Sequence, residues 1–195
     1  MDEEKVRKVM IEYFKSKGMK PNPQRGAGPD ILIDGMAVET KGSRYEFQRM
    51  LKQLVSYAYK YSEVSLALPV DGLTFERASQ LEILCFYLMT AGRKGFDLYI
   101  VFVLDQNRRT YGVFKCIRKT LFGRLPFVIS GNLFQPAIFP VLSNEDTLEI
   151  AIKKLEPLIL WNPVETAEKK LLDCIRDGTG ILKASLGGEI SIIQI

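Results

Sequence analysis

The chain has 195 residues, 47% of them hydrophobic, and a formal net charge of +4, which is typical of one domain with or without a C-terminal extension. It contains no histidine and only three cysteines, Cys85, Cys116 and Cys174, with no Cys-x-x-Cys pair among them. Catalysis by a Ser/His or Cys/His pair is therefore excluded, a zinc site is disfavoured, and an iron–sulfur cluster lacks its fourth ligand. Hydrolytic chemistry would have to use carboxylates, lysine and a hard metal ion.

The spacing of apolar residues predicts seven elements in the first half of the chain. In order they are a helix at 3–17, strands at 30–34 and 36–41, a helix at 45–61, a strand at 63–69, a helix at 74–91 and a strand at 97–104. A tight turn at Gly35 joins the first two strands, and helices join the later ones. This order predicts an α/β fold with a mixed central β-sheet flanked by helices.

The pattern is weaker after residue 105. It predicts an edge strand at 111–119, short strands or loops at 121–143, and helices at 145–157 and 164–176, with Pro157 and Pro163 between the two helices. The end of the chain, 180–195, has the pattern of a hairpin with Gly187 and Gly188 at its turn. We therefore expect a core at 1–125 and a C-terminal α+β extension at 126–195 that packs on it, with no role assigned.

The charge is distributed unevenly between these two parts. Residues 1–125 carry 21 Lys or Arg and 14 Asp or Glu, whereas residues 126–195 carry 6 and 9. A basic core is what a polyanion-binding surface requires, although an ordinary solvated surface fits as well. No apolar run approaches the ~18 residues of a membrane span, and the start MDEEKVRK is unlike a signal peptide. We therefore expect a cytoplasmic protein with no membrane partner.

The most informative stretch is GPDILIDGMAVETK at 28–41, because it places charged residues at one end of each of two apolar strands. Asp30 opens the first strand, and Glu39-Thr40-Lys41 closes the second. Glu39 and Lys41 are two positions apart, so they face the same side of a strand, and a hairpin of this length would bring Asp30 beside Glu39. The backbone carbonyl of Thr40 lies between them and offers another oxygen. Two carboxylates, a carbonyl and an ammonium suit a Mg²⁺ or Mn²⁺ ion and a phosphate, which is the chemistry of metal-assisted phosphodiester hydrolysis.

GPDILI and AVETKG resemble the core motif of the PD-(D/E)XK nuclease superfamily, which includes restriction endonucleases, archaeal Holliday junction resolvases and RecB-type nucleases. The resemblance covers the motif and the element order of about residues 1–105. It implies a restriction-endonuclease-like fold and a Mg²⁺-dependent deoxyribonuclease, an endonuclease rather than an exonuclease, acting in DNA repair or recombination. It implies Asp30, Glu39 and Lys41 as catalytic residues, with the two acids and Thr40 on the metal. It also implies an acid from the first helix, for which the helical angle selects Glu3.

The resemblance extends to candidate DNA contacts. The loop RGAGPD is similar to the loop before the first acid of archaeal junction resolvases, which implies that Arg25 lies near DNA. QLVSY is similar to the Q-x-x-x-Y motif of RecB-like and Cas4-like members, which implies Gln53 and Tyr57 as contacts to phosphate or to the Lys41 end of the site. Ser43 and Arg44 follow the motif directly and could meet the phosphate backbone.

Several alternatives stay open. A second basic cluster could track DNA or could be a solvated edge; its residues are Arg108, Arg109, Lys115, Arg118 and Lys119. Many relatives dimerise, and the apolar tail EISIIQI could pair with another chain, so a homodimer is compatible with the sequence. The chain could also be an inactive nucleic-acid-binding module of the same fold, or a scaffold subunit of a DNA-processing complex.

Overall fold

The structure is a computed structural model that describes residues 1–73, 75–116, 143, 145–160 and 188–195. Its elements are α1 (Glu3–Ser16), β1 (Asn22–Pro23), β2 (Ile31–Ile33), β3 (Met36–Thr40), α2 (Phe47–Lys60), β4 (Glu63–Pro69), the 3₁₀ turn η1 (Val70–Gly72), α3 (Phe75–Thr90), β5 (Asp97–Asp105), β6 (Thr110–Cys116), α4 (Leu148–Leu160) and β7 (Gly188–Gln194).

The described strands form one seven-stranded sheet in the order β1-β2-β3-β4-β5-β6-β7. The β3–β4 and β4–β5 pairs are parallel and the other four pairs are antiparallel. The predicted α/β fold with a mixed sheet is therefore confirmed. We call the edge where β3, β4 and β5 finish, and where β6 begins, the carboxyl end of the sheet. Both α1 and α2 begin at this end, because α1 starts beside Gly42 and α2 leads back to the start of β4.

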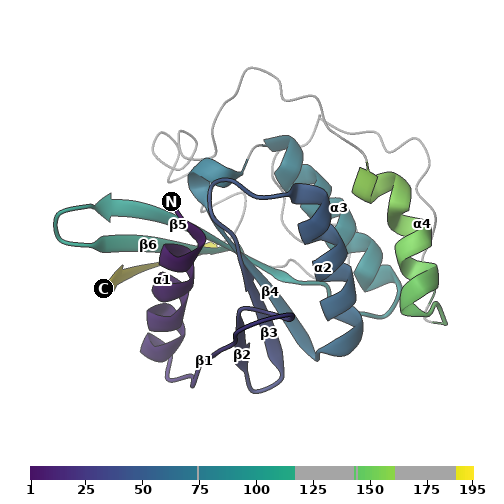
Figure 1. The fold of residues 1–195 in the computed structure, drawn as a ribbon, viewed down its shortest axis with the longest axis horizontal. Helices are drawn as coiled ribbons and strands as arrows, with labels where there is room; N and C mark the ends of the chain where they lie inside the picture. Colours follow the sequence, from purple (N-terminus) through teal and green to yellow (C-terminus); the bar gives the residue numbers. More distant parts are fainter. Residues whose placement is uncertain (74, 117–142, 144, 161–187) are drawn as a thin grey trace.

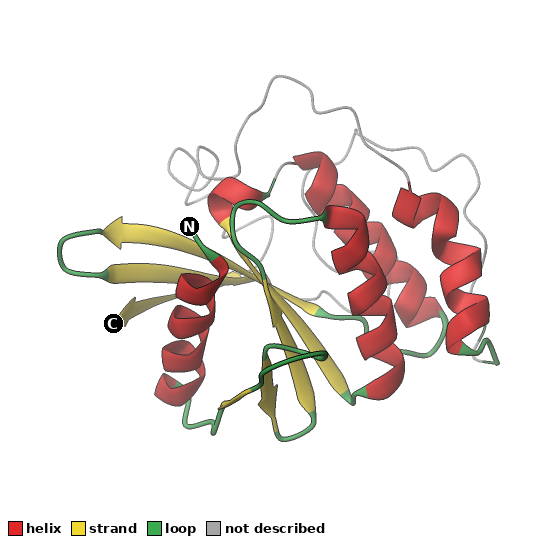
Figure 2. Ribbon diagram, viewed as in Figure 1, coloured by secondary structure: helices red, strands yellow, loops and turns green. Residues whose placement is uncertain are grey.

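Helices cover both faces of the sheet, α1 on one and α2, α3 and α4 on the other (Figures 1 and 2). The sequence produces this layering because alternate strand residues supply two separate cores. Val38, Tyr99 and Val101 pack with the apolar stripe of α1, which comprises Val6, Val9, Met10, Tyr13 and Phe14. Leu66, Leu98 and Ile100 pack with the other helices.

The turn between β2 and β3 fixes the register of this hairpin. Asp34 and Gly35 both have positive φ, 45° and 86°, and Ile33 pairs with Met36 across them. This is the geometry of a two-residue type I′ turn, for which Asp-Gly is a favoured sequence. Because a slip of one residue would move every side chain to the other face, the turn decides what lies opposite Glu39.

Four details of the predicted elements were wrong. The two-residue strand β1 was missed, because Pro23 argues against a strand. The strand predicted at the sheet edge, β6, is internal, because β7 pairs with it. The fourth helix continues through Pro157 to Leu160, and Gly188 lies within β7 rather than at a turn. The segments predicted at 164–176 and 180–187, and nearly all of 121–143, lie outside the described residues.

Within the described residues, the longest apolar stretches of helix are too short or too polar to cross a bilayer.

Candidate active site

The β2–β3 hairpin brings Asp30 to the carboxyl end of β3. Ile31 lies opposite Val38 in the last pair of the ladder, and continuing this register by one step would bring Asp30 opposite Glu39. The Oδ2 atom of Asp30 accepts hydrogen bonds from the Thr40 backbone nitrogen at 2.7 Å and from the Thr40 hydroxyl at 2.9 Å. Oδ1 has no hydrogen bond to any described residue. The hairpin thus orients this carboxylate by one oxygen and leaves the other available.

Pro29 leaves the backbone carbonyl oxygen of Thr40, beside Asp30, without a hydrogen-bond donor from the neighbouring strand. The register that pairs Ile31 with Val38 would bring Pro29 opposite Thr40, in a position where a backbone N–H would donate to the Thr40 carbonyl. Proline has no N–H, so the ladder cannot close there. The Thr40 carbonyl, which the sequence proposed as a metal ligand, therefore keeps acceptor capacity next to Asp30.

Glu39 and Lys41 form a buried ion pair. Lys41 Nζ donates to Glu39 Oε1 at 2.5 Å, and the two side chains are 14% and 2% exposed. The other carboxylate oxygen, Glu39 Oε2, is buried and has no hydrogen-bond partner among the described residues. A buried charged acceptor without a partner is costly, so Oε2 is a candidate to bind a ligand.

The electrostatics of the site follow from this burial. Burial raises the pKa of the Glu39 carboxyl, and the charge of Asp30 adds to the rise, although the Lys41 ammonium and the Tyr57 hydroxyl oppose it. Burial and the charge of Glu39 also raise the pKa of Tyr57, which keeps its proton. The Tyr57 hydroxyl therefore lies close enough to Glu39 to affect its pKa. Its geometry is nevertheless not that of a hydrogen bond to Oε2.

The structure therefore brings Asp30, Glu39, Lys41 and Tyr57 together, from β2, β3 and α2. Tyr57 is buried on α2, whereas Gln53, one turn earlier on the helix, is half-buried and makes no hydrogen bond to them. The helical spacing of the Q-x-x-x-Y pattern thus places the tyrosine at the site without a matching glutamine contact.

The loop after Lys41 connects the site to the first turn of α1. A side-chain carbon at Gly42 would lie 2.8 Å from the Glu3 backbone nitrogen, so only glycine fits there without displacing backbone. The Ser43 hydroxyl donates to Asp71 Oδ2 at 2.7 Å and also meets the backbone of Met1. Ser43 and Asp71 come from loops that follow β3 and β4, and the sequence alone gave no signal that they would meet.

The remaining predicted residues do not join this cluster. The backbone of Glu3 lies beside Gly42, but its side chain is exposed and has no hydrogen bond or ion pair with Asp30 or Glu39. Arg25 and Arg44 are exposed in the loops that precede β2 and follow β3, with no ion pair to a described residue. The cluster therefore offers two carboxylates, a backbone carbonyl, an ammonium and a phenol, from Asp30, Glu39, Thr40, Lys41 and Tyr57.

A metal ion here would depend on few side chains. Within the described ranges, no three Asp, Glu, Cys or His side chains gather closely enough to hold an ion by themselves. Comparisons of the chain with protein-family models, with curated proteins and with solved structures find no match.

Proposed function

We propose that the protein is a Mg²⁺- or Mn²⁺-dependent deoxyribonuclease that hydrolyses phosphodiester bonds at Asp30, Glu39 and Lys41. The observation that carries the proposal is the buried Oε2 atom of Glu39, which has no hydrogen-bond partner among the described residues and lies in a cluster with Asp30. Proteins seldom leave a buried carboxylate oxygen unsatisfied unless it has a ligand or a chemical role.

The donor set fits a hard divalent cation. Glu39 Oε2, Asp30 Oδ1 and the Thr40 carbonyl are oxygens free of hydrogen bonds that the described chain could supply, and water would complete the shell. Mg²⁺ usually takes one or two carboxylates and keeps several waters, so a site with only two carboxylates suits it. When bound, such an ion polarises the phosphate and lowers the pKa of a bound water.

The side chains of the site then have separate tasks. Thr40 holds the Asp30 carboxylate through two hydrogen bonds to one oxygen. Lys41 supplies a positive charge beside Glu39, where it can neutralise the charge that develops on the phosphate. Tyr57 keeps its proton and so remains a donor to the Glu39 side of the site. Hydrolysis itself needs only water, whose oxygen bonds to phosphorus as one ester oxygen leaves with a proton.

The resemblance to the PD-(D/E)XK superfamily supports the same proposal. The motif residues that suggested it are the ones that converge here, at one edge of a mixed sheet with helices on both faces. The proposal therefore includes a restriction-endonuclease-like arrangement of the core, with internal cleavage of DNA favoured over removal of terminal nucleotides.

A cleavage assay on a mixed panel of substrates tests the proposal. Plasmid, linear duplex, single strand, flap and four-way junction would be incubated with Mg²⁺, Mn²⁺ or EDTA. The Glu39→Ala variant should lose metal-dependent cutting. The matched control is Glu63→Ala, an exposed glutamate on the neighbouring strand β4, which should cut as the native chain does. Cutting that persists in Glu39→Ala, or that persists in EDTA, would refute the assignment.

A further inference from the structure

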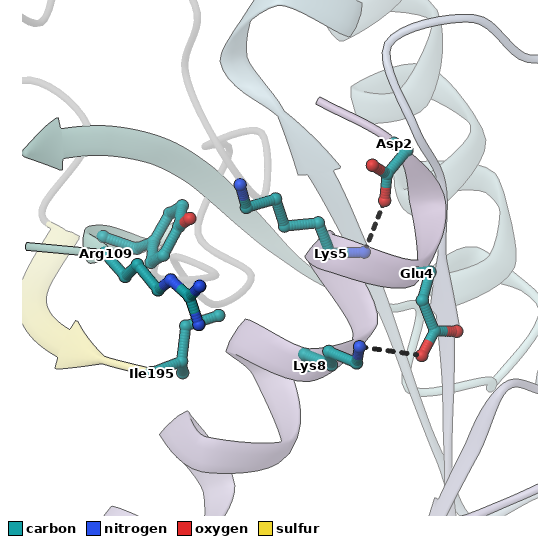
Figure 3. Close-up of a pocket in the computed structure, with 7 residues that line it drawn as sticks. Asp2, Glu4, Lys5, Lys8, Arg109 and Ile195 are labelled. Atoms are coloured by element: carbon teal, nitrogen blue, oxygen red, sulfur yellow. Dashed lines mark hydrogen bonds and ion pairs between the residues drawn. The ribbon is translucent and has the colours of Figure 1, made fainter. Parts of the chain in front are cut away.

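A groove of about 480 Å³ lies between the first turns of α1 and the start of β6 (Figure 3). A second hollow of about 310 Å³ shares Lys5 and Tyr111 with it and reaches Met1 and Asp71, which contact the loop after Lys41. The two hollows thus run along the carboxyl end of the sheet from Met1 and Asp71, which contact the loop after Lys41, to Arg109.

Two cations in this groove have no acidic partner in the described part of the chain. Lys5 Nζ lies 5.5 Å from the centre of the Tyr111 ring and forms no ion pair there. Arg109 is exposed at the β5–β6 turn, and it likewise pairs with no described carboxylate. Its neighbours in the basic cluster differ, because Arg108 pairs with Asp105 at 3.7 Å and Lys115 with Asp97 at 3.5 Å.

The acids that line the two hollows are already engaged. Asp2 caps α1 by accepting a hydrogen bond from the Lys5 backbone nitrogen at 2.7 Å. Glu4 pairs with Arg7 and with Lys8, the latter at 3.7 Å (Figure 3). Asp71 accepts from Ser43 and pairs with the Met1 amine at 3.1 Å. Lys5 and Arg109 are therefore the cations of the two hollows without a described carboxylate partner, while Asp2 keeps its negative charge at the start of α1.

The groove lies at a distance from the candidate active site that suits a nucleic-acid strand. Lys41 is bonded to Ala67 on β4, Pro69 on β4 lies opposite Val101 on β5, and Val103 on β5 lies opposite Tyr111 on β6. Three steps between strands of ~4.8 Å each give about 14 Å across the sheet, and the path also advances about three residues of ~3.3 Å along the strands, so the separation is roughly 18 Å. A strand of B-form DNA carries one phosphate per ~3.4 Å of helix axis, so this distance corresponds to roughly five nucleotides.

We propose that this groove binds the phosphate backbone of the DNA strand on one side of the scissile bond, with Lys5 and Arg109 as its contacts. The inference rests on the proposed nuclease function, since it defines the contact by its distance from the cleaved bond. Of the described residues in the second basic cluster, Arg108, Arg109 and Lys115, the inference gives only Arg109 a role in binding DNA.

The test is the salt dependence of DNA binding by the full chain in EDTA, where metal-dependent cutting is stopped. Fluorescence anisotropy with a labelled duplex would compare the native chain with Lys5→Gln/Arg109→Gln. The matched control, Lys20→Gln/Lys60→Gln, removes two exposed charges, one beyond the far end of α1 and one at the last residue of α2. Each lost phosphate contact should lower the slope of log K against log salt by about 0.9, so the groove variant should lose about 1.8. Lys5→Arg/Arg109→Lys, which keeps both charges, should restore most of the slope.

A neutral methylphosphonate moved along the strand then locates the contact. One placed about five nucleotides from the cleaved bond should weaken binding by the native chain and leave the groove variant unaffected. A groove variant with the slope of the control would overturn the inference while leaving metal-dependent cleavage intact. Conversely, the groove variant could lose slope in the binding assay while the native chain cuts no DNA. That result would refute the nuclease proposal and support a nucleic-acid-binding groove.

Discussion

Replacing Glu39 by glutamine should stabilise the protein when no metal ion is present. The substitution keeps the size of a side chain that is 2% exposed and removes a charge whose Oε2 atom has no described partner. An unsatisfied buried acceptor costs ~1–3 kcal/mol, which glutamine avoids because the amide nitrogen that replaces Oε2 can donate to the neighbouring Tyr57 hydroxyl oxygen. The Lys41 bond to a neutral amide loses about 1 kcal/mol relative to a carboxylate. The net expectation is a gain of about 1 kcal/mol, or roughly 2–4 °C in melting temperature for a chain of this length.

The gain should depend on pH in a defined direction. Burial raises the pKa of Glu39, so the folded state holds the proton more tightly than the unfolded state does. The contribution of the native glutamate to stability is then complete below its ordinary unfolded pKa and is lost as pH rises through the raised folded pKa. The advantage of glutamine should therefore be absent in acid and should grow toward neutral pH.

Metal ions should reverse the order of the two proteins. Binding at 100 times the dissociation constant adds about 2.7 kcal/mol to the native chain, or roughly 5–11 °C, and glutamine should remove most of it. Thermal unfolding of both proteins from pH 4 to 8, in EDTA and in Mn²⁺, measures each effect. Glu63→Gln, at an exposed glutamate of β4, should change neither. Equal stability in EDTA at pH 8 would refute the buried-charge argument, and equal Mn²⁺ shifts would refute the metal site.

Three further substitutions test the support of the site. Thr40→Val removes the hydroxyl bonded to Asp30, so it should cost about 1 kcal/mol and weaken Mn²⁺ binding in calorimetry, whereas Thr40→Ser should retain both. Gly42→Ala places a carbon 2.8 Å from the backbone of α1, so chemical denaturation should show a loss of ~1–3 kcal/mol; unchanged stability would contradict the close packing. Tyr57→Phe should lower the rate of cleavage more than it lowers stability, because it removes a donor near Glu39; an unaltered rate would exclude a role for the hydroxyl.

Local signals in the sequence predicted the parts of the fold that depend on local contacts. The Asp-Gly turn and the alternation of β3 predicted that Asp30 lies beside Glu39, and in the structure Asp30 bonds to the adjacent Thr40 and its charge acts on Glu39. Helical spacing predicted the buried face of α1. The same reasoning failed for β6, because its neighbour β7 begins 72 residues after β6 ends and no short-range pattern connects them.

The surroundings of the site were harder to predict for the same physical reason. The contact of Ser43 with Asp71 joins loops that follow different strands, and the groove at Lys5 joins the first helix to the start of β6. Such neighbours are decided by how the helix packs on the sheet. Glu3 shows why a helical angle alone does not identify a metal ligand. Its backbone lies beside Gly42, next to the site, but its carboxylate is exposed.

The short hairpin also has a consequence for how the protein acquires its chemistry during folding. Asp30 and Thr40 are ten positions apart, so bringing them together costs little chain entropy, whereas Cys116 must find Gly188 to complete the sheet. The carboxylates and the carbonyl can thus reach their relative positions early, before the last strand docks. Assembly of the ligand oxygens and completion of the sheet would then be separate kinetic events, and the slower one would be the closure of β7 onto β6.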